Sequence, residues 1–359
     1  MRSKYKLGDI ISLVDKRNTN FECTNLKGLS MTKEFRPSTS NIVGTDLSKY
    51  KIVEYNQFAV DFMSTIRVHR MPIALNKLRE NIIISPAYAV FEVKDESVIL
   101  TDYLMMWFLR PEFDRYADFR CDAAIRGGYG WNELCDTDIE IPEIEEQKKR
   151  VFEYKTITDR IALKQRINDN LEKQAESLYK EMLNNKDDWL KVSTLEEVSN
   201  IKTGKLNSEA AVLDGVYPFF TCSQETYRTN TFSFDQEAVL LAGNNASAIY
   251  PLKIFKGKFD AYQRTYVISS KNESVSNKQL YFMLKQQLNE FKGISSGTAT
   301  KFLTMKILSP LPVVIARPDI AKTFYSATDK MFETIFQNDK EITNLKELRK
   351  IILTRLSNS

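Results

Sequence analysis

Apolar residues recur at steps of three and four along two long stretches of the chain. The first stretch carries Ile144, Val151, Tyr154, Ile157, Ile161, Ile167, Leu171, Ala175, Leu178 and Met182, and the second carries Ile320, Phe324, Ala327, Met331, Ile335, Ile342, Leu345, Ile352 and Leu356. No glycine or proline occurs between Glu143 and Leu183, or from Asp319 to the last residue. The pattern predicts two helices of roughly forty residues, each about 60 Å long.

A helix of this length exposes its apolar stripe to water unless another helix covers it. The nearest partner for each predicted helix is the other one. If the two halves of the chain are related by a pseudo-twofold axis that crosses the helices, the helices run in opposite directions. We therefore predict an antiparallel coiled coil.

The segments that precede the two predicted helices repeat in the same order. Residues 89–97 correspond to residues 266–274, and both runs are rich in β-branched and aromatic residues and end in a polar turn. An apolar-periodic helix, a glycine-bearing loop and an apolar segment with a proline follow in each half, at residues 102–109, 126–130 and 141–142 and at residues 278–288, 295–298 and 311–312. Four matching pairs in one order indicate an internal duplication.

This repetition predicts an α+β fold with two α/β domains separated by two long helices. We place the first domain at residues 1–142, the first helix at 143–184, the second domain at 185–312 and the second helix at 313–359. Each domain is long enough to bury its own core.

Composition excludes several classes of protein but does not by itself indicate a partner. The chain has 51 basic and 47 acidic residues and a net charge of +4, which is too balanced to predict nucleic-acid binding. Its four cysteines are far apart in the sequence, so we expect free thiols and no metal site. No apolar run is long enough for a membrane helix, and the first residues do not resemble a secretory signal, so we expect a cytoplasmic protein.

Residues typical of catalysis are sparse. His69 is the single histidine, and no carboxylate lies close to it in the sequence. The segment from Ser199 to Lys205 resembles a phosphate-binding loop, but Ser199 stands where such a loop has its first glycine, so we interpret it as an ordinary turn. The chain has no Asn-Pro-Pro-aromatic segment and no dinucleotide fingerprint. We therefore predict no catalytic residues and no enzyme in this chain.

Side chains suited to DNA recognition are found in predicted loops. The candidates in the first domain are Lys16, Arg17, Arg67, Arg70, Arg120, Arg126, Gly127, Gly128 and Tyr129, and those in the second are Gln224, Arg228, Asn244, Asn245, Tyr262, Gln263, Arg264, Ser296, Thr298 and Lys301. Lys253, Lys256 and Lys258 extend the second set. Arginine and lysine can bond guanine edges, asparagine and glutamine can pair with adenine, and other members can hold phosphates. Surface loops are rich in these residue types in any protein, so a purely structural role for each remains open.

The order of domain, long helix, domain, long helix resembles the specificity subunits of type I restriction-modification systems. Short segments are also similar to that family, namely residues 84–88 (ISPAY), 141–147 (IPEIEEQ), 260–265 (DAYQRT) and 296–298 (SGT). The second junction, residues 312–320 (PVVIARPDI), lacks the Glu-Gln pair of the first. The cap of the second helix is therefore left open.

The resemblance implies that each domain binds one half of a split double-stranded DNA target, with the helices setting the gap between the halves. Two methyltransferase subunits, and in some systems restriction and translocase subunits, would be the protein partners. S-adenosylmethionine, ATP and Mg²⁺ would belong to those partners, so we expect no cofactor in this chain.

Three alternatives remain open at this point. The chain is the specificity subunit of a related assembly in which methyltransferase and nuclease are fused in one partner, or a coiled-coil adaptor that spaces two protein-binding domains, or an enzyme with an unrecognised active site.

Overall fold

The computed structural model describes residues 2–38, 44–122, 129–271, 273–295, 297 and 300–358. The chain divides into two compact units, each made of one globular domain and parts of both long helices. Unit 1 comprises Met1–Ile161 and Asn344–Ser359, and unit 2 comprises Ala162–Thr343. The long helices are α6, Ile144–Asn184, and α10, Pro318–Asn358, each of 41 residues. The boundaries between the two units lie inside both long helices. The predicted boundaries, which separate each domain from its helix, therefore differ from those of the compact units.

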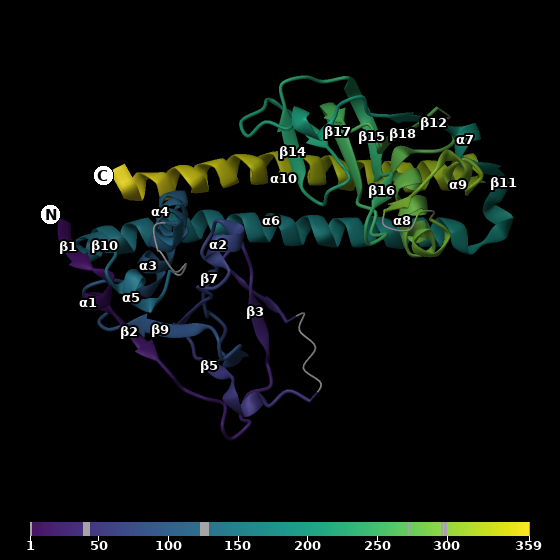
Figure 1. The fold of residues 1–359 in the computed structure, drawn as a ribbon. Helices are drawn as coiled ribbons and strands as arrows, with labels where there is room; N and C mark the ends of the chain where they lie inside the picture. The colour runs from purple at the N-terminus through teal and green to yellow at the C-terminus, as the bar shows by residue number, and fades with distance from the viewer. Residues whose placement is uncertain are drawn as a thin grey trace. The chain divides into compact units, whose positions relative to one another are not determined.

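Unit 1 is built on a four-stranded sheet with strand order β2-β9-β6-β7, and three further strand pairs (Figure 1). Its strands are β1 Arg2–Lys6, β2 Ile11–Val14, β3 Lys27–Leu29, β4 Phe35–Pro37, β5 Lys51–Val53, β6 Phe58–Val60, β7 Ile73–Leu75, β8 Ile82–Ile84, β9 Ala89–Val93 and β10 Asp138–Pro142. Its helices are α1 Leu7–Ile10, the 3-10 turn Leu47–Lys49, α2 Thr65–Val68, α3 Thr101–Phe108, α4 Pro111–Asp122 and α5 Trp131–Cys135. The core includes the stacked rings of Phe58 and Phe91, with Phe108 packed edge-on against both.

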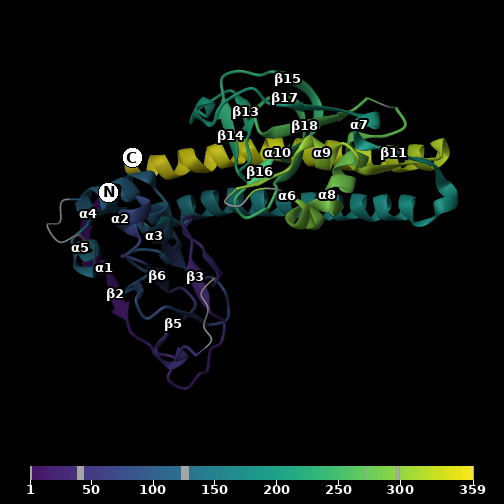
Figure 2. The same ribbon diagram turned by 45° about the vertical axis from the view of Figure 1, so that its right-hand side comes forward.

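Unit 2 has a larger sheet of six strands in the order β12-β18-β15-β17-β13-β14 (Figure 2). Its strands are β11 Trp189–Thr194, β12 Ser199–Thr203, β13 Tyr217–Phe220, β14 Thr226–Thr229, β15 Phe234–Ala242, β16 Asn244–Asn245, β17 Leu252–Ala261, β18 Thr265–Ser270, β19 Lys301–Phe302 and β20 Pro312–Ala316. Its helices are α7 Leu195–Val198, α8 Asn277–Ile294, α9 Met305–Leu308 and the 3-10 turns Lys186–Asp188 and Ser208–Ala210.

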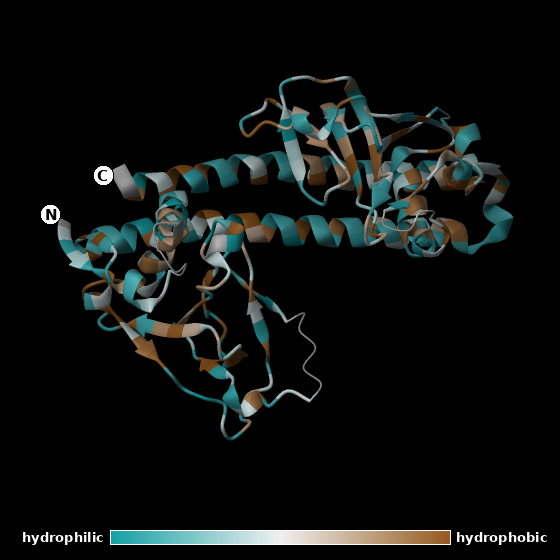
Figure 3. Cartoon of the chain, viewed as in Figure 1, coloured by the Kyte–Doolittle hydropathy of each residue, from teal (hydrophilic) through white to brown (hydrophobic). Residues whose placement is uncertain are grey.

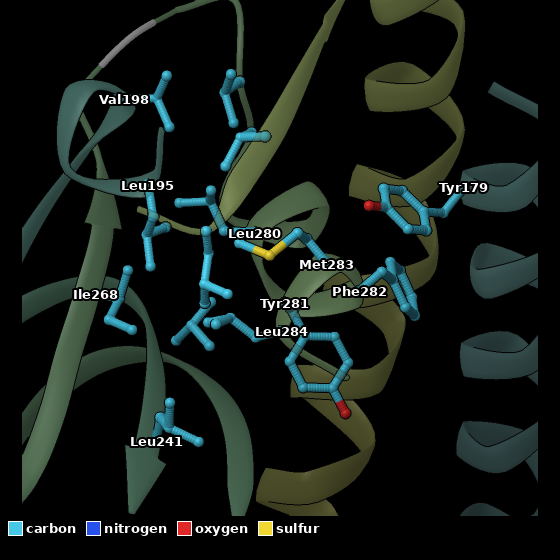
Figure 4. Packing of buried hydrophobic residues seen from close by; sticks show 14 of the residues in the cluster. Tyr179, Leu195, Val198, Leu241, Ile268, Leu280, Tyr281, Phe282, Met283 and Leu284 are labelled. Atoms are coloured by element: carbon cyan, nitrogen blue, oxygen red, sulfur yellow. The ribbon is translucent and has the colours of Figure 1, made fainter. Parts of the chain in front are cut away.

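Helix α8 joins the sheet of unit 2 to α6 and α10. Its apolar residues pack among Leu195 and Val198 of α7, Leu241 and Ile268 of the sheet, and Tyr179 of α6 (Figure 4). The rings of Tyr179 and Phe282 stack with centroids 5.8 Å apart. The serine at the start of α8, Ser276, accepts a hydrogen bond from the Gln279 amide, as an N-cap serine does.

The predicted duplication is confirmed by the topology. The sheet order β2-β9-β6-β7 in unit 1 corresponds to β12-β18-β15-β17 in unit 2, and the pair β1-β10 corresponds to β11-β20. Single hydrogen bonds repeat as well. Lys94 Nζ donates to the Gly8 carbonyl, and Lys271 Nζ, at the matching position, donates to the Glu196 carbonyl. The alignment of residues 89–97 with 266–274 is therefore correct residue by residue.

One predicted correspondence is wrong. Pro312 does not end the last strand of the second domain, as Pro142 does in the first, but begins strand β20. Ala316 takes the place of Pro142, because Pro142 pairs with Arg2 and Ala316 pairs with Trp189, at the outer ends of equivalent strand pairs. The second helix accordingly begins at Pro318 and not at residue 313. A proline suits the first helical position because no intrahelical acceptor is lost there.

The two long helices are antiparallel within each unit. In unit 2, Lys164 contacts Asn338 and Glu341, whereas Tyr179, further along α6, contacts Phe324, further back along α10. In unit 1, the first turns of α6 lie against the last turns of α10, where Glu146, Lys149, Arg150 and Glu153 line one hollow with Ile352, Arg355 and Leu356. Hydrophobic and hydrophilic residues alternate along both helices (Figure 3), as expected for helices buried on one face.

Within the described residues, no helix is both long and apolar enough to cross a membrane. None of the four cysteines, all of which lie in the described residues, forms a disulfide. No group of three or more potential metal ligands occurs in the described part of the chain.

Candidate nucleic-acid interface

The second domain brings several of the predicted DNA-binding residues together at strand ends and turns. Gln224 lies in the exposed loop between β13 and β14, and Tyr262, Gln263 and Arg264 form the turn between β17 and β18. The Sγ atom of Cys222, in the first loop, lies 3.4 Å from the Arg264 carbonyl oxygen in the turn. The two segments are therefore neighbours, and Gln224, Gln263 and Arg264 are all exposed.

A third segment joins them through strands β16 and β19. The Arg264 guanidinium lies over the Phe302 ring, 5.2 Å from its centroid, and Phe302 of β19 pairs with Asn244 of β16. Asn245 pairs with Lys301 in the same ladder. The candidates of β16, β19 and the 262–264 turn thus form one surface, which we call the unit 2 recognition surface together with the loop of residues 221–225.

Close backbone approach fixes this surface. A Cβ atom on Gly204 would lie 1.9 Å from the Ala261 carbonyl oxygen, and one on Gly243 would lie 2.5 Å from the Arg264 carbonyl oxygen. Both positions require glycine, because any side chain would collide with the backbone of the 261–264 segment. Residues 199–203 form strand β12, so the prediction of an ordinary turn for the 199–205 segment is wrong over these residues. The segment also lacks the order of a phosphate-binding loop, which leads directly into a helix.

Some candidates make hydrogen bonds with the protein itself. The Arg228 guanidinium donates to the carbonyl oxygens of Gly215 and Val216, each at 3.1 Å. The Asn245 side-chain oxygen accepts from the backbone of Ser247 and Ile249. These two side chains shape the loops and have less hydrogen-bonding capacity left for DNA than Gln224 or Gln263.

Asn244 differs from its neighbour Asn245. Its side-chain oxygen is buried and has no hydrogen-bond partner in the structure. A buried acceptor without a donor is costly, so this oxygen is available to a donor such as a water molecule or a ligand group.

In the first domain, Lys16 and Arg17 are engaged by carboxylates. Lys16 contacts Glu54 at 2.7 Å, and this contact raises the pKa of Lys16. Arg17 contacts Asp15 at 2.9 Å and donates to the Lys49 carbonyl oxygen. Local neutralisation weakens the attraction of both side chains for phosphate.

The other basic candidates of the first domain surround α2 and α4. Arg67 and Arg70 are exposed at the end of α2, and Arg120 is half-buried near the end of α4. His69 lies between them with a left-handed backbone, φ 53°, and its Nδ1 atom is 2.9 Å from Asp118 of α4. The sequence shows no carboxylate near His69, because Asp118 is brought to it only by the packing of α4 on α2.

Tyr88 of the first domain was not selected from the sequence as a DNA-binding candidate, although it lies in the 84–88 segment. Burial raises its pKa, and the charge of Asp61 adds to this effect while Arg36 and Arg67 oppose it. The charges of Arg36 and Arg67 therefore act on the Tyr88 hydroxyl.

Tyr129 is a correction to the predicted set. Its side chain is 1% exposed, and its hydroxyl hydrogen-bonds to Thr137. Burial also raises its pKa. A ring enclosed in the core cannot reach DNA, so Tyr129 is a core residue. Arg126, Gly127, Gly128, Ser296 and Thr298 lie outside the described residues.

Comparison with known proteins relates the sequence and the fold of the chain to characterised proteins. The family model of the type I restriction modification DNA specificity domain matches residues 186–351. Those residues, somewhat less than half of the chain, are similar to that domain. The EcoDI specificity subunit of Escherichia coli is 31% identical over 171 residues, which are 46% of this chain and 37% of that subunit. The chain thus matches little more than a third of the length of this curated relative.

One solved structure matches almost the whole chain in its fold. The type I S subunit from M. genitalium matches 99% of this chain and 96% of its own length, with a TM-score of 0.59 and 13% identity. An HsdS subunit from Thermoanaerobacter tengcongensis covers the same 99% at 15% identity, but its TM-score of 0.37 supports no further conclusion. The first match shows that the whole chain shares the fold of that S subunit.

Proposed function

We propose that this chain is the DNA-recognition subunit of a type I restriction-modification complex and has no catalytic centre of its own. The observation that carries the proposal is the duplication itself, in which each of two recognition domains is joined to the same pair of antiparallel helices. The match of residues 186–351 to the specificity domain supports it. Two similar domains on one chain can each bind one half of a split double-stranded DNA target.

The unit 2 recognition surface offers the chemistry that base recognition needs. Gln224 and Gln263 can donate to and accept from adenine, and Arg264, supported by the Phe302 ring, can bond the two acceptors of a guanine edge. In unit 1, the exposed side chains suited to DNA binding are Arg67 and Arg70. Residues that are engaged by carboxylates, such as Lys16, would contribute less.

The helices would set the number of base pairs between the two half-sites, and two adenine methyltransferase subunits would bring the reaction. S-adenosylmethionine would belong to those subunits, and ATP and Mg²⁺ to restriction subunits where these are present. This function places the protein in the cytoplasm, together with the DNA. The proposal predicts activity only for the complex.

The test is to express the chain with and without its methyltransferase and to map N6-methyladenine over the genome of the host. The expected result is one split motif that is methylated only when both proteins are present. A stable complex that adds no methylation, or a motif without a gap, would contradict the proposed function.

A further inference from the structure

Lys253 lies directly beneath the loop that carries Gln224. It stands on β17, and its Nζ atom is 3.0 Å from the Thr226 hydroxyl and 3.5 Å from the Ser223 carbonyl oxygen. The ammonium is also 5.7 Å from the centre of the Phe220 ring. These groups are neutral, so they solvate the charge only in part.

Two other lysines of the chain are desolvated in a similar way, and both have a carboxylate beside them. Burial lowers the pKa of Lys33, which contacts Asp114 at 2.8 Å, and that of Lys51, which contacts Asp15 at 3.8 Å. Burial lowers the pKa of Lys253 to about 8, and no carboxylate of the described residues lies within ion-pair distance of it. Glu225, on the same loop, acts on it only from further away.

A half-buried ammonium without a counterion is unfavourable unless an anion arrives from outside. The loop above Lys253 also carries Gln224, and Cys222 connects that loop to the Arg264 turn. An anion bound at Lys253 would therefore lie at the edge of the unit 2 recognition surface.

We propose that Lys253 binds a backbone phosphate of DNA and thereby fixes the 221–226 loop over the base edges. The inference rests on the proposed function and adds a role to one residue of it. Phosphate contacts position a protein on the duplex, and base contacts then give the specificity. Lys253 is thus a positioning residue for Gln224.

The salt dependence of DNA affinity separates a phosphate contact from a merely structural lysine. Each neutralised phosphate adds about 0.9 to the slope of log K against log salt. The experiment uses the full chain in complex with its methyltransferase and a duplex that carries the mapped motif. For Lys253→Met we expect a slope smaller by about 0.9, so that between 50 and 200 mM salt the wild type loses about threefold more affinity than the variant.

Lys256→Met is the matched control, because Lys256 lies on the same strand, is exposed and already contacts Glu333 at 3.1 Å. It removes the same charge, and we expect the slope to stay unchanged. Lys253→Arg should restore the slope. If Lys253 only closes the loop, Lys253→Met will weaken binding but leave the slope as in the wild type, and the inference is wrong.

Two further results keep this test separate from the proposed function. If the wild-type complex shows no preference for the motif, the proposed function fails. If it prefers the motif but Lys253→Met and Lys256→Met have equal slopes, only the role of Lys253 fails. Adding inorganic phosphate at constant ionic strength distinguishes the source of the anion. If Lys253 binds free phosphate, the affinity of the complex for DNA will fall as phosphate is added. We expect this affinity to stay unchanged.

Discussion

The two globular domains are joined to their long helices at equivalent places but by different residues. In unit 1, Gln147 of α6 is fully buried and reaches from the helix into the domain, where its amide bonds the carbonyl oxygens of Val98 and Pro142 and accepts from the Leu100 amide. In unit 2, counting from the strand end, Ala321 occupies the position of Gln147 and offers no polar group.

The hydrogen bonds of the second junction come from Gln279 of the domain and from Tyr325 of α10. Gln279 of α8 donates to the Val314 carbonyl oxygen at 2.6 Å. The Tyr325 hydroxyl of α10 lies 2.9 Å from the Gln279 side-chain oxygen and 2.5 Å from the Ser274 carbonyl oxygen. A glutamine therefore links strand, loop and helix in both units, but it stands on the long helix in one and on the domain helix in the other. In both units the buried backbone groups of the junction have hydrogen-bond partners, but the residue that supplies them differs in position.

The domains also differ in how they pack on the helices. Apolar residues of α3 in unit 1 pack near Val151 and Tyr154 of α6. In unit 2, Lys278 and Lys285 of α8 contact Asp329 of α10 and Glu172 of α6 in addition to the apolar core. Ion pairs are directional, so we infer that Lys278 and Lys285 help to orient the second domain on its helix segments.

The largest effect is expected from exchange of a whole domain. Replacing residues 188–317 with the equivalent segment of another specificity chain should change one half of the methylated motif completely and leave the other half unchanged. The segment includes β20 and Arg317, because Arg317 bonds the Asp188 carbonyl oxygen and closes the strand pair. Genome-wide methylation mapping measures the outcome. A change in both halves would show that the two domains do not act separately.

Next, Gln147→Leu should destabilise unit 1 by about 3 kcal/mol, because it leaves three backbone groups without partners. Gln279→Leu should lower the stability of unit 2 by about half as much, since it affects one backbone acceptor and one hydroxyl. The Tyr325 hydroxyl keeps its hydrogen bond to the Ser274 carbonyl oxygen. Denaturant unfolding in a Trp189→Phe background isolates unit 1, because the two other tryptophans, Trp107 and Trp131, lie there. Hydrogen exchange of α8 amides gives the value for unit 2. Equal costs would contradict the proposed difference between the junctions.

A smaller loss of about 2 kcal/mol is expected for Lys278→Met, because Glu237 would then be left with little access to water and without its cation. Lys256→Met is the control, since both partners of the Lys256–Glu333 pair are largely exposed and such pairs contribute less than about 1 kcal/mol. Hydrogen exchange of residues 277–294 reports both variants. If they behave alike, the charged contacts of α8 do not hold the second domain.

The smallest expected effect is on the pH dependence of DNA affinity, and it concerns Lys253 in the second domain. The pKa of Lys253 is about 8 and that of free lysine is 10.5, so Lys253 is charged at pH 7 and loses its charge as the pH rises through 8. Affinity for the motif should therefore fall by up to about tenfold between pH 7 and 9, the effect of one charge-assisted hydrogen bond. Lys253→Arg stays charged and should not show this fall. Equal pH profiles would exclude titration of Lys253 as the cause.

Much of the fold could be predicted because its signals are local. The helical period fixed α6 to within one residue of its predicted start, and the similarity of residues 89–97 to 266–274 located equivalent strands. The start of α10 was misplaced by five residues because Pro312 resembles Pro142 in the sequence, whereas strand pairing alone shows that Ala316 is its counterpart.

The candidate site was predictable only in its residue types. Arginines, glutamines and asparagines in loops could be selected from the sequence, but their hydrogen-bond partners could not. Arg228 binds carbonyl oxygens 12 and 13 residues away, and Tyr129 folds into the core beside Thr137. Lys253 is distinguished from other lysines only by what surrounds it.

The sequence alone therefore determined the duplication, the long amphipathic helices and the family resemblance, because periodicity and repeated segments are properties of neighbouring residues. The tertiary structure decided which polar side chains are exposed, which are engaged by the protein and where a buried charge has no counterion. These depend on residues far apart in the chain, such as Lys253 and Thr226 on different strands, and burial and ion pairing arise only when folding brings such residues together.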